Sequence, residues 1–95
     1  LSYEAFYDCI GLTSVTIPSS VTYIGTGAFY GCSNLMKIHC KNPKAPFPSD
    51  YYSSYGNIFF SDPTYTKATL YVPRGSHDAY KYTLGWGHFT HIVEE

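Results

Sequence analysis

Short segments of the chain alternate apolar and polar residues in the way that a half-buried β-strand does. In the segment 14–17, Val15 and Ile17 would face one side of a strand, while Ser14 and Thr16 would face the other. The segments 37–40 and 69–72 show the same alternation. The pattern therefore predicts three short strands, each with one apolar face.

The strand segments belong to a repeated unit. Residues 5–17 and 28–40 are similar along their whole length, at the constant offset that aligns Ala5 with Ala28. Ala, Phe, Tyr, Cys and Leu recur identically, and Val15 is matched by Ile38. Chance would not preserve both size and polarity over such a length, so the similarity indicates a true repeat. A unit this short cannot close its own core, so successive units must stack, with their strands about 4.8 Å apart in a parallel sheet.

The rest of each unit is predicted to turn the chain back beneath its strand. Pro18 would end the first strand, and Gly25 would permit a tight bend. Ala28 and Phe29 would then form a short turn that places the phenylalanine in the core. Stacking would set each such Phe over the Phe of the neighbouring unit.

A third strand fits the same ladder at 69–73, where Leu70 and Val72 would face the core. Pro73 follows this strand as Pro18 follows the first. The interval from Ile38 to Leu70 is longer than the regular interval from Val15 to Ile38. The added length lies between residues 41 and 67, and this Pro-, Ser- and Tyr-rich stretch predicts an extended loop.

These features resemble the BspA-type leucine-rich repeats. Residues 17–35 match that family's signature at every named position, Ile-Pro-x-Ser-Val-Thr-x-Ile-Gly-x-x-Ala-Phe-x-x-Cys-x-x-Leu, and the segment 69–93 resembles its terminal unit. The resemblance implies a right-handed solenoid of units of about 23 residues, with a parallel short-strand sheet and a C-terminal capping helix. It also implies a non-catalytic protein-interaction or adhesion module of a secreted or cell-surface bacterial protein.

The repeat register divides the chain into a partial first unit (1–18), a complete unit (19–41), a widened unit (42–73) and a C-terminal cap (74–95). Leu1 aligns with Ile24, so the chain begins within a repeat and its N-terminal face is expected to be open core. The C-terminal end is expected to be closed, with Trp86 and Phe89 covering the last repeat.

The cap is predicted to contain a short helix. Ser76 would be its N-cap, and Asp78 would complement the helix dipole in the first turn. Tyr80 and Leu84 would share a face, because they are spaced i, i+4. Gly85 would end the helix.

Composition excludes several classes of function. Hydrophobic residues make up 44% and charged residues 14% of the chain, which indicates an ordered protein. The formal net charge is −1 and the six Lys and Arg residues are scattered, so a nucleic-acid partner lacks its usual basic face. No apolar run reaches the length of a transmembrane segment.

The cysteines are predicted to be free thiols. Cys9 and Cys32 are equivalent residues one repeat apart. Stacked side chains hold their Cβ vectors parallel, which suits disulfide geometry poorly. A ladder of small apolar thiols is the simpler interpretation.

Two short motifs suggest chemistry that the sequence does not support. His88 and His91 lack the third and fourth converging ligands that zinc requires, and no CxxC or HExxH motif accompanies them. Ser76, His77 and Asp78 are the residue types of a hydrolytic triad, but consecutive residues are not expected to converge as that mechanism needs. We therefore expect no enzyme activity, metal or cofactor.

Two surfaces remain as candidate binding sites. The outward strand residues form the first: Ser14, Thr16, Lys37, His39, Thr69 and Tyr71. The loop forms the second: Phe47, Tyr51, Tyr52 and Tyr55. The first favours a protein ligand from a host or cell surface, although a solvated face without a partner is equally natural. The second offers aromatic contact area for a glycan, as in a carbohydrate-binding accessory module, unless its tyrosines fold back over the widened unit.

Overall fold

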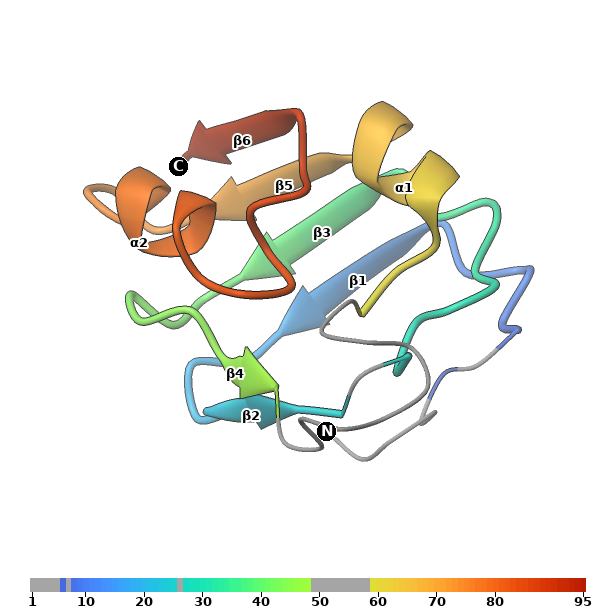
Figure 1. Cartoon of the computed structure of the whole chain (residues 1–95), viewed down its shortest axis with the longest axis horizontal. Coiled ribbons are helices and arrows are strands. Elements are labelled where there is room, and N and C mark those ends of the chain that lie inside the picture. Colours follow the sequence, from blue (N-terminus) through green and yellow to red (C-terminus); the bar gives the residue numbers. More distant parts are fainter. Residues whose placement is uncertain (1–5, 7, 26, 49–58) are drawn as a thin grey trace.

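The computed structural model of this chain describes residues 6, 8–25, 27–48 and 59–95. Its main element is a four-stranded, all-parallel sheet (Figure 1). The strands lie in the order β1 (Ser14–Ile17), β3 (Lys37–Cys40), β5 (Thr69–Val72) and β6 (His91–Glu94). Val15 pairs with Ile38, and Ile38 pairs with Leu70, so the predicted register of the first three strands is confirmed.

The fourth strand, β6, was not predicted. It pairs in parallel with β5, and Ile92 lies opposite Leu70, at nearly the regular repeat spacing. The segment 74–95 therefore does more than cover the last repeat. It completes a further turn of the chain and adds a strand to the sheet.

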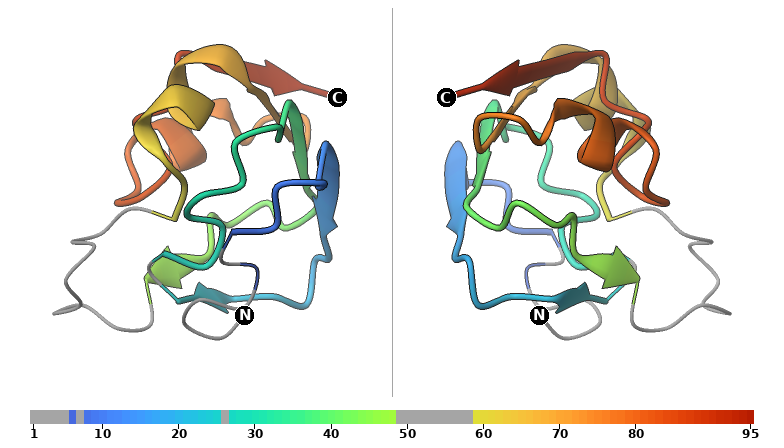
Figure 2. Two further views of the ribbon diagram at one scale, coloured as in Figure 1. Left: turned by 90° about the vertical axis from the view of Figure 1, so that its right-hand side faces the viewer. Right: turned by 90° about the vertical axis from the view of Figure 1, so that its left-hand side faces the viewer.

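A second, smaller sheet lies across the core from the first. Its strands β2 (Tyr23–Ile24) and β4 (Phe47–Pro48) also run parallel, with Tyr23 opposite Phe47. Figure 2 shows the large sheet on one side of the molecule and the β2–β4 pair on another, joined by the turns of each unit. Ile24 is fully buried between them.

The stretch 41–67 is not an extended loop throughout, contrary to the sequence prediction. It contains β4 near its start and the helix α1 (Asp62–Lys67) at its end. The local sequence suits a helix start, because Pro63 lies in the first turn, where its missing N–H costs no hydrogen bond, and Asp62 complements the helix dipole. Tyr65 on this helix is buried; its hydroxyl donates to the Gly85 carbonyl at 2.7 Å and accepts from the Phe59 N–H at 2.9 Å.

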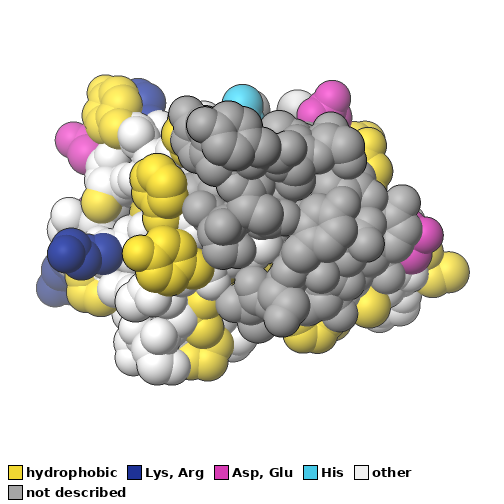
Figure 3. Space-filling view, turned by 60° about the horizontal axis from the view of Figure 1, so that its bottom comes forward, with side chains coloured by type: hydrophobic (Ala, Val, Ile, Leu, Met, Phe, Trp, Pro, Cys, Tyr) yellow, Lys and Arg dark blue, Asp and Glu magenta, His cyan; other side chains and the backbone are white. Residues whose placement is uncertain are grey.

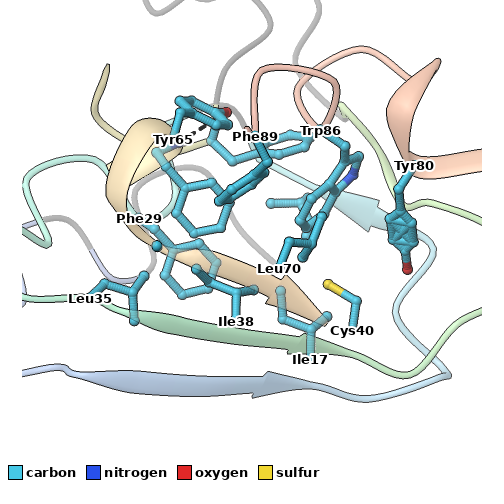
Figure 4. Packing of buried hydrophobic residues seen from close by; sticks show 14 of the residues in the cluster. Ile17, Phe29, Leu35, Ile38, Cys40, Tyr65, Leu70, Tyr80, Trp86 and Phe89 are labelled. Atoms are coloured by element: carbon cyan, nitrogen blue, oxygen red, sulfur yellow. Dashed lines mark hydrogen bonds between the residues drawn. The ribbon is translucent and has the colours of Figure 1, made fainter. Parts of the chain in front are cut away.

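The core is organised by a stack of phenylalanine rings, one from each unit. Phe6 lies parallel to Phe29 with ring centroids 5.1 Å apart, and Phe29 lies parallel to Phe60 at 5.0 Å. The predicted stacking of Phe on Phe is thus confirmed, with Phe60 as the third member. Trp86 and Phe89 contact Phe60 edge to face, so they cover this end of the stack. Figure 4 shows Phe29, Trp86 and Phe89 together in the core.

The spacing between paired residues shows where the widened unit gains its length. The regular interval separates the partners Val15 and Ile38, and nearly the same interval separates Tyr23 and Phe47. Phe29 and Phe60, which form a bridge, are farther apart in the sequence than these pairs. The paired residues of β3 and β5 are also farther apart in the sequence. Most of the added residues therefore lie between β4 and Phe60.

The helix α2 (His77–Lys81) differs from its prediction in three respects. Ser76 occupies the N-cap position, but its side chain makes no capping hydrogen bond. The helix ends at Lys81 rather than at Gly85, so Leu84 lies beyond it and is exposed, while Tyr80 is buried. The Thr83 hydroxyl donates to the Ala79 carbonyl at 2.6 Å and so satisfies one of the last carbonyls of the helix.

The N-terminus of α2 is instead capped by a residue from β6. The Glu94 carboxylate accepts a hydrogen bond from the His77 N–H at 3.0 Å. Hydrogen bonds from the His77 and Gly75 backbone hold the pKa of Glu94 below its usual range. This contact ties the helix to the edge strand of the sheet.

The central ring of the stack should be the position most sensitive to truncation. We expect Phe29→Ala to lower the free energy of unfolding by about 3–5 kcal/mol, because it removes a fully buried ring with partners on both sides. Urea denaturation followed by the fluorescence of Trp86, the single tryptophan, measures this loss. The exposed Tyr82→Ala variant is the control and should change stability by less than about 0.5 kcal/mol. Equal losses in the two variants would contradict the central role of the stack.

Candidate functional site

The outward residues of the large sheet form two rows, as the alternation predicts. The strand register aligns Ser14, Lys37, Thr69 and His91 in one row and Thr16, His39, Tyr71 and Val93 in the other. The six residues proposed from the sequence are thus brought together on one face. Their neighbours Ile38, Leu70 and Val72 point inward and are fully buried.

The centre of this face is a stacked pair of rings. His39 and Tyr71 lie 4.6 Å apart between ring centroids, with their planes within 9° of parallel. The parallel register sets these residues directly opposite each other on β3 and β5, which is why the rings overlap. The pair gives the face a rigid aromatic centre, because each ring restricts the rotamers of the other.

An acidic residue just after β6 reaches across to β3. Glu95 Oε1 lies 3.0 Å from His39 Nδ1 and 3.5 Å from Lys41 Nζ. The hydrogen bond from His39, with the nearby positive charges, holds the pKa of the Glu95 carboxyl below its usual range. The Glu95 N–H also donates to the Val72 carbonyl at 2.9 Å, which fixes the residue at the end of the sheet.

Several polar groups on the face remain open to a ligand. Within the described part of the chain, the Lys37 ammonium and the Tyr71 hydroxyl make no hydrogen bond or ion pair. The hydroxyls of Ser14 and Thr16 lie on the same face, at exposed positions. Hydrogen-bonding groups around a rigid aromatic centre are the arrangement that protein interfaces use.

The second candidate surface is only partly described. Phe47 lies on β4 with 45% of its surface exposed. Tyr51, Tyr52 and Tyr55 lie outside the described residues, so their proposed role stays a prediction. The Phe47 side chain lines a cleft together with Tyr23, which the sequence interpretation did not include.

All three cysteines are free thiols, as predicted. Cys32 is buried, and its thiol donates to the Phe6 carbonyl at 3.0 Å. Burial raises the pKa of Cys32. Burial also raises the pKa of Cys40 to about 12. Such thiols stay protonated and serve as small apolar side chains of the core.

The short motifs with possible chemistry lie near the C-terminal end, where Ser76 is buried and Asp78 is exposed. His77 Nδ1 lies 3.0 Å from Asp78 Oδ1, so two of these three consecutive residues meet. The Ser76 hydroxyl makes no hydrogen bond to either of them in the described structure. His88 contacts the Tyr65 ring, while His91 lies on the outer face of β6. Among the described residues, no three His, Cys, Asp or Glu side chains are placed to hold a metal ion.

The sequence reasoning missed the part of the face that β6 supplies. His91 and Val93 extend the two outward rows, and Glu95 anchors His39. The spacing was a signal, because His91–Glu94 follows β5 at nearly the repeat interval, but Val93 and Glu94 break the alternation that marks the other strands. No helix in the described ranges is long and apolar enough to cross a membrane.

Acid should weaken the contacts of Glu95. The pKa of Glu95 is lower in the folded chain than in the unfolded one. The stability that Glu95 adds to the fold is therefore fully present at pH values above the usual pKa of a carboxyl group, and it is lost as the pH falls through the pKa of the folded state. We expect Glu95→Gln to lower the Tm at neutral pH and to have a diminishing effect as the solution is acidified. Thermal unfolding of the parent and the variant at several pH values measures this difference. A difference that is independent of pH would contradict the prediction.

Comparison with protein families agrees with the repeat geometry. The family model described as BspA type leucine rich repeat region (6 copies) matches residues 1–70. A comparison with curated proteins finds no match. The match covers most of the first three strands of the parallel sheet and all three rings of the phenylalanine stack. Because it spans well over half of the sequence, and the strands pair in the register that the repeat requires, the chain belongs to the BspA-type leucine-rich-repeat family.

Proposed function

We propose that the chain is a non-catalytic protein-interaction module that binds its partner on the outer face of the large sheet. The observation that supports this best is the stacked His39–Tyr71 pair at the centre of a face on which Ser14, Thr16 and Lys37 are exposed. Family membership supports the same class of function, since leucine-rich-repeat proteins commonly present such surfaces to protein ligands.

The face is suited to binding because it is formed before the partner arrives. Its strands are joined by parallel ladders, and its central rings are held by each other and by Glu95. A surface that is already ordered loses little conformational entropy on association. Aromatic residues at the centre of an interface commonly contribute most of the binding energy.

We further propose that the partner is a host or cell-surface protein and that the module serves adhesion by a secreted or surface-exposed bacterial protein. Its family membership supports this location. The net charge of −1 favours recognition through shape, aromatic contact and local hydrogen bonds over long-range electrostatic attraction.

A triple substitution tests the proposed surface. We expect the chain to bind at least one member of a panel of purified extracellular-matrix and cell-surface proteins in biolayer interferometry. The Lys37→Ala, His39→Ala, Tyr71→Ala variant should bind that partner at least about tenfold more weakly, because it removes the aromatic centre and an open cation.

The matched control is Tyr82→Ala, which truncates a ring that is 77% exposed and lies away from the sheet. It should leave the affinity unchanged. Circular dichroism must show that both variants are folded. Undiminished binding by the triple variant, or the absence of binding to any protein of the panel, would contradict the proposal.

A further inference from the structure

A cleft of about 380 Å³ lies beside the small sheet, away from the outer face of the large one. It is lined by Thr22, Tyr23, Asn42, Lys44, Ala45 and Phe47. Figure 3 shows the molecule with this side turned forward, and hydrophobic side chains gather there beside Lys or Arg side chains. The volume lies in the lower part of the range typical of small-molecule sites, roughly 300–1,000 Å³.

Two aromatic side chains of the cleft are placed by strand pairing. Tyr23 on β2 lies opposite Phe47 on β4, and the Phe47 N–H donates to the Thr22 carbonyl at 2.9 Å. Alternation along β2 buries Ile24 and turns Tyr23 outward, so that 58% of Tyr23 and 45% of Phe47 are exposed. Neither ring belongs to the buried core.

The opposite wall of the cleft, residues 41–46, is fixed by side chains of the C-terminal unit. The Tyr80 hydroxyl donates to the Asn42 carbonyl at 2.6 Å, and Trp86 Nε1 donates to the Pro46 carbonyl at 2.8 Å. Asn42 also donates from its own amide to the Val21 carbonyl at 3.1 Å and accepts from the Lys44 N–H at 3.0 Å. The cleft is thus a preformed feature with a rigid wall.

These hydrogen bonds also restrict what the cleft can recognise. The carbonyls of Asn42 and Pro46 and the N–H groups of Lys44 and Phe47 are used within the protein. An added peptide strand would need such main-chain groups, so strand addition is disfavoured here. Recognition is left to side chains, namely two aromatic rings, the Thr22 hydroxyl and the Lys44 ammonium.

The positive charge of the Lys44 ammonium favours a ligand that carries a negative charge. Lys44 is exposed, and it makes no ion pair in the described part of the chain, whereas neighbouring Lys41 is paired with Glu95. An exposed cation beside aromatic rings complements a ligand that carries both an apolar ring face and an anionic group. A sugar with a carboxylate has both, together with hydroxyls that Thr22 can bond.

We propose that this cleft binds a carboxylate-bearing sugar residue of a glycan, with Tyr23 and Phe47 against the sugar ring and Lys44 on its carboxylate. The site is separate from the sheet face, so a glycan ligand and a protein partner could be engaged independently.

A matched pair of sugars tests the proposal on the whole chain. Methyl β-D-glucuronide and methyl β-D-glucoside differ only at C6, which is a carboxylate in the first and a hydroxymethyl group in the second, and their binding is followed by NMR titration. We expect the glucuronide to shift the amide signals of Thr22, Tyr23 and Phe47 and to bind about tenfold more tightly than the glucoside. Lys44→Met, which keeps the stem and removes the charge, should abolish that preference, and Phe47→Ala should weaken both sugars.

Lys37→Met removes a cation from the sheet face and is the control, so it should leave sugar binding unchanged. The dispersion of the NMR spectrum shows whether each variant is folded. Absence of shifts at the cleft, a preference that survives Lys44→Met, or tighter binding of a hexaglutamate peptide than of the glucuronide would each overturn the proposal. None of these results depends on whether the sheet face binds a protein.

Discussion

The stack of Phe6, Phe29 and Phe60 is the contact on which the rest of this structure depends. Each unit contributes one ring, and no unit has enough apolar surface to bury its ring alone. Placing the rings about 5 Å apart also brings the strands to hydrogen-bonding distance, because the spacing of parallel strands is nearly the same. Core and sheet therefore form together, and Trp86 and Phe89 close the end of the stack that the C-terminal unit covers.

Features set by the repeat itself could be predicted from the sequence. The facing of Ile38, Leu70 and Val72 follows from period-two alternation, and the pairing of Val15 with Ile38 follows from the repeat spacing. The burial of Phe29 and the free thiol of Cys32 follow from the same register.

Features that depend on contacts between units could not be predicted in this way. Glu94 caps α2, and Glu95 contacts His39, only because β6 lies at the edge of the sheet. The helix α1 was not predicted, because proline within a Pro-, Ser- and Tyr-rich stretch favours a loop, although a proline in the first turn is compatible with a helix. Gly85 does not end α2, because the chain leaves the helix earlier to bring Trp86 over Phe59 and Phe60.

The two proposed binding surfaces share one source of rigidity. Tyr80 and Trp86 bury their rings against the core and use their polar atoms to fix the segment 41–46. That segment follows β3 directly, so it connects the sheet that carries His39 to the strand that carries Phe47. Side chains of the last unit thereby determine the geometry of surfaces that belong to earlier units.

The spacing of the paired residues has a consequence for the evolution and engineering of such repeats. The widened unit keeps two parallel contacts with the unit before it, the β2–β4 pair and the Phe29–Phe60 bridge. The partners of these two contacts lie at different intervals along the sequence, so the contacts themselves, and not a fixed repeat length, set the ladder. Units of unequal length can therefore follow one another in such an array without loss of register between their strands.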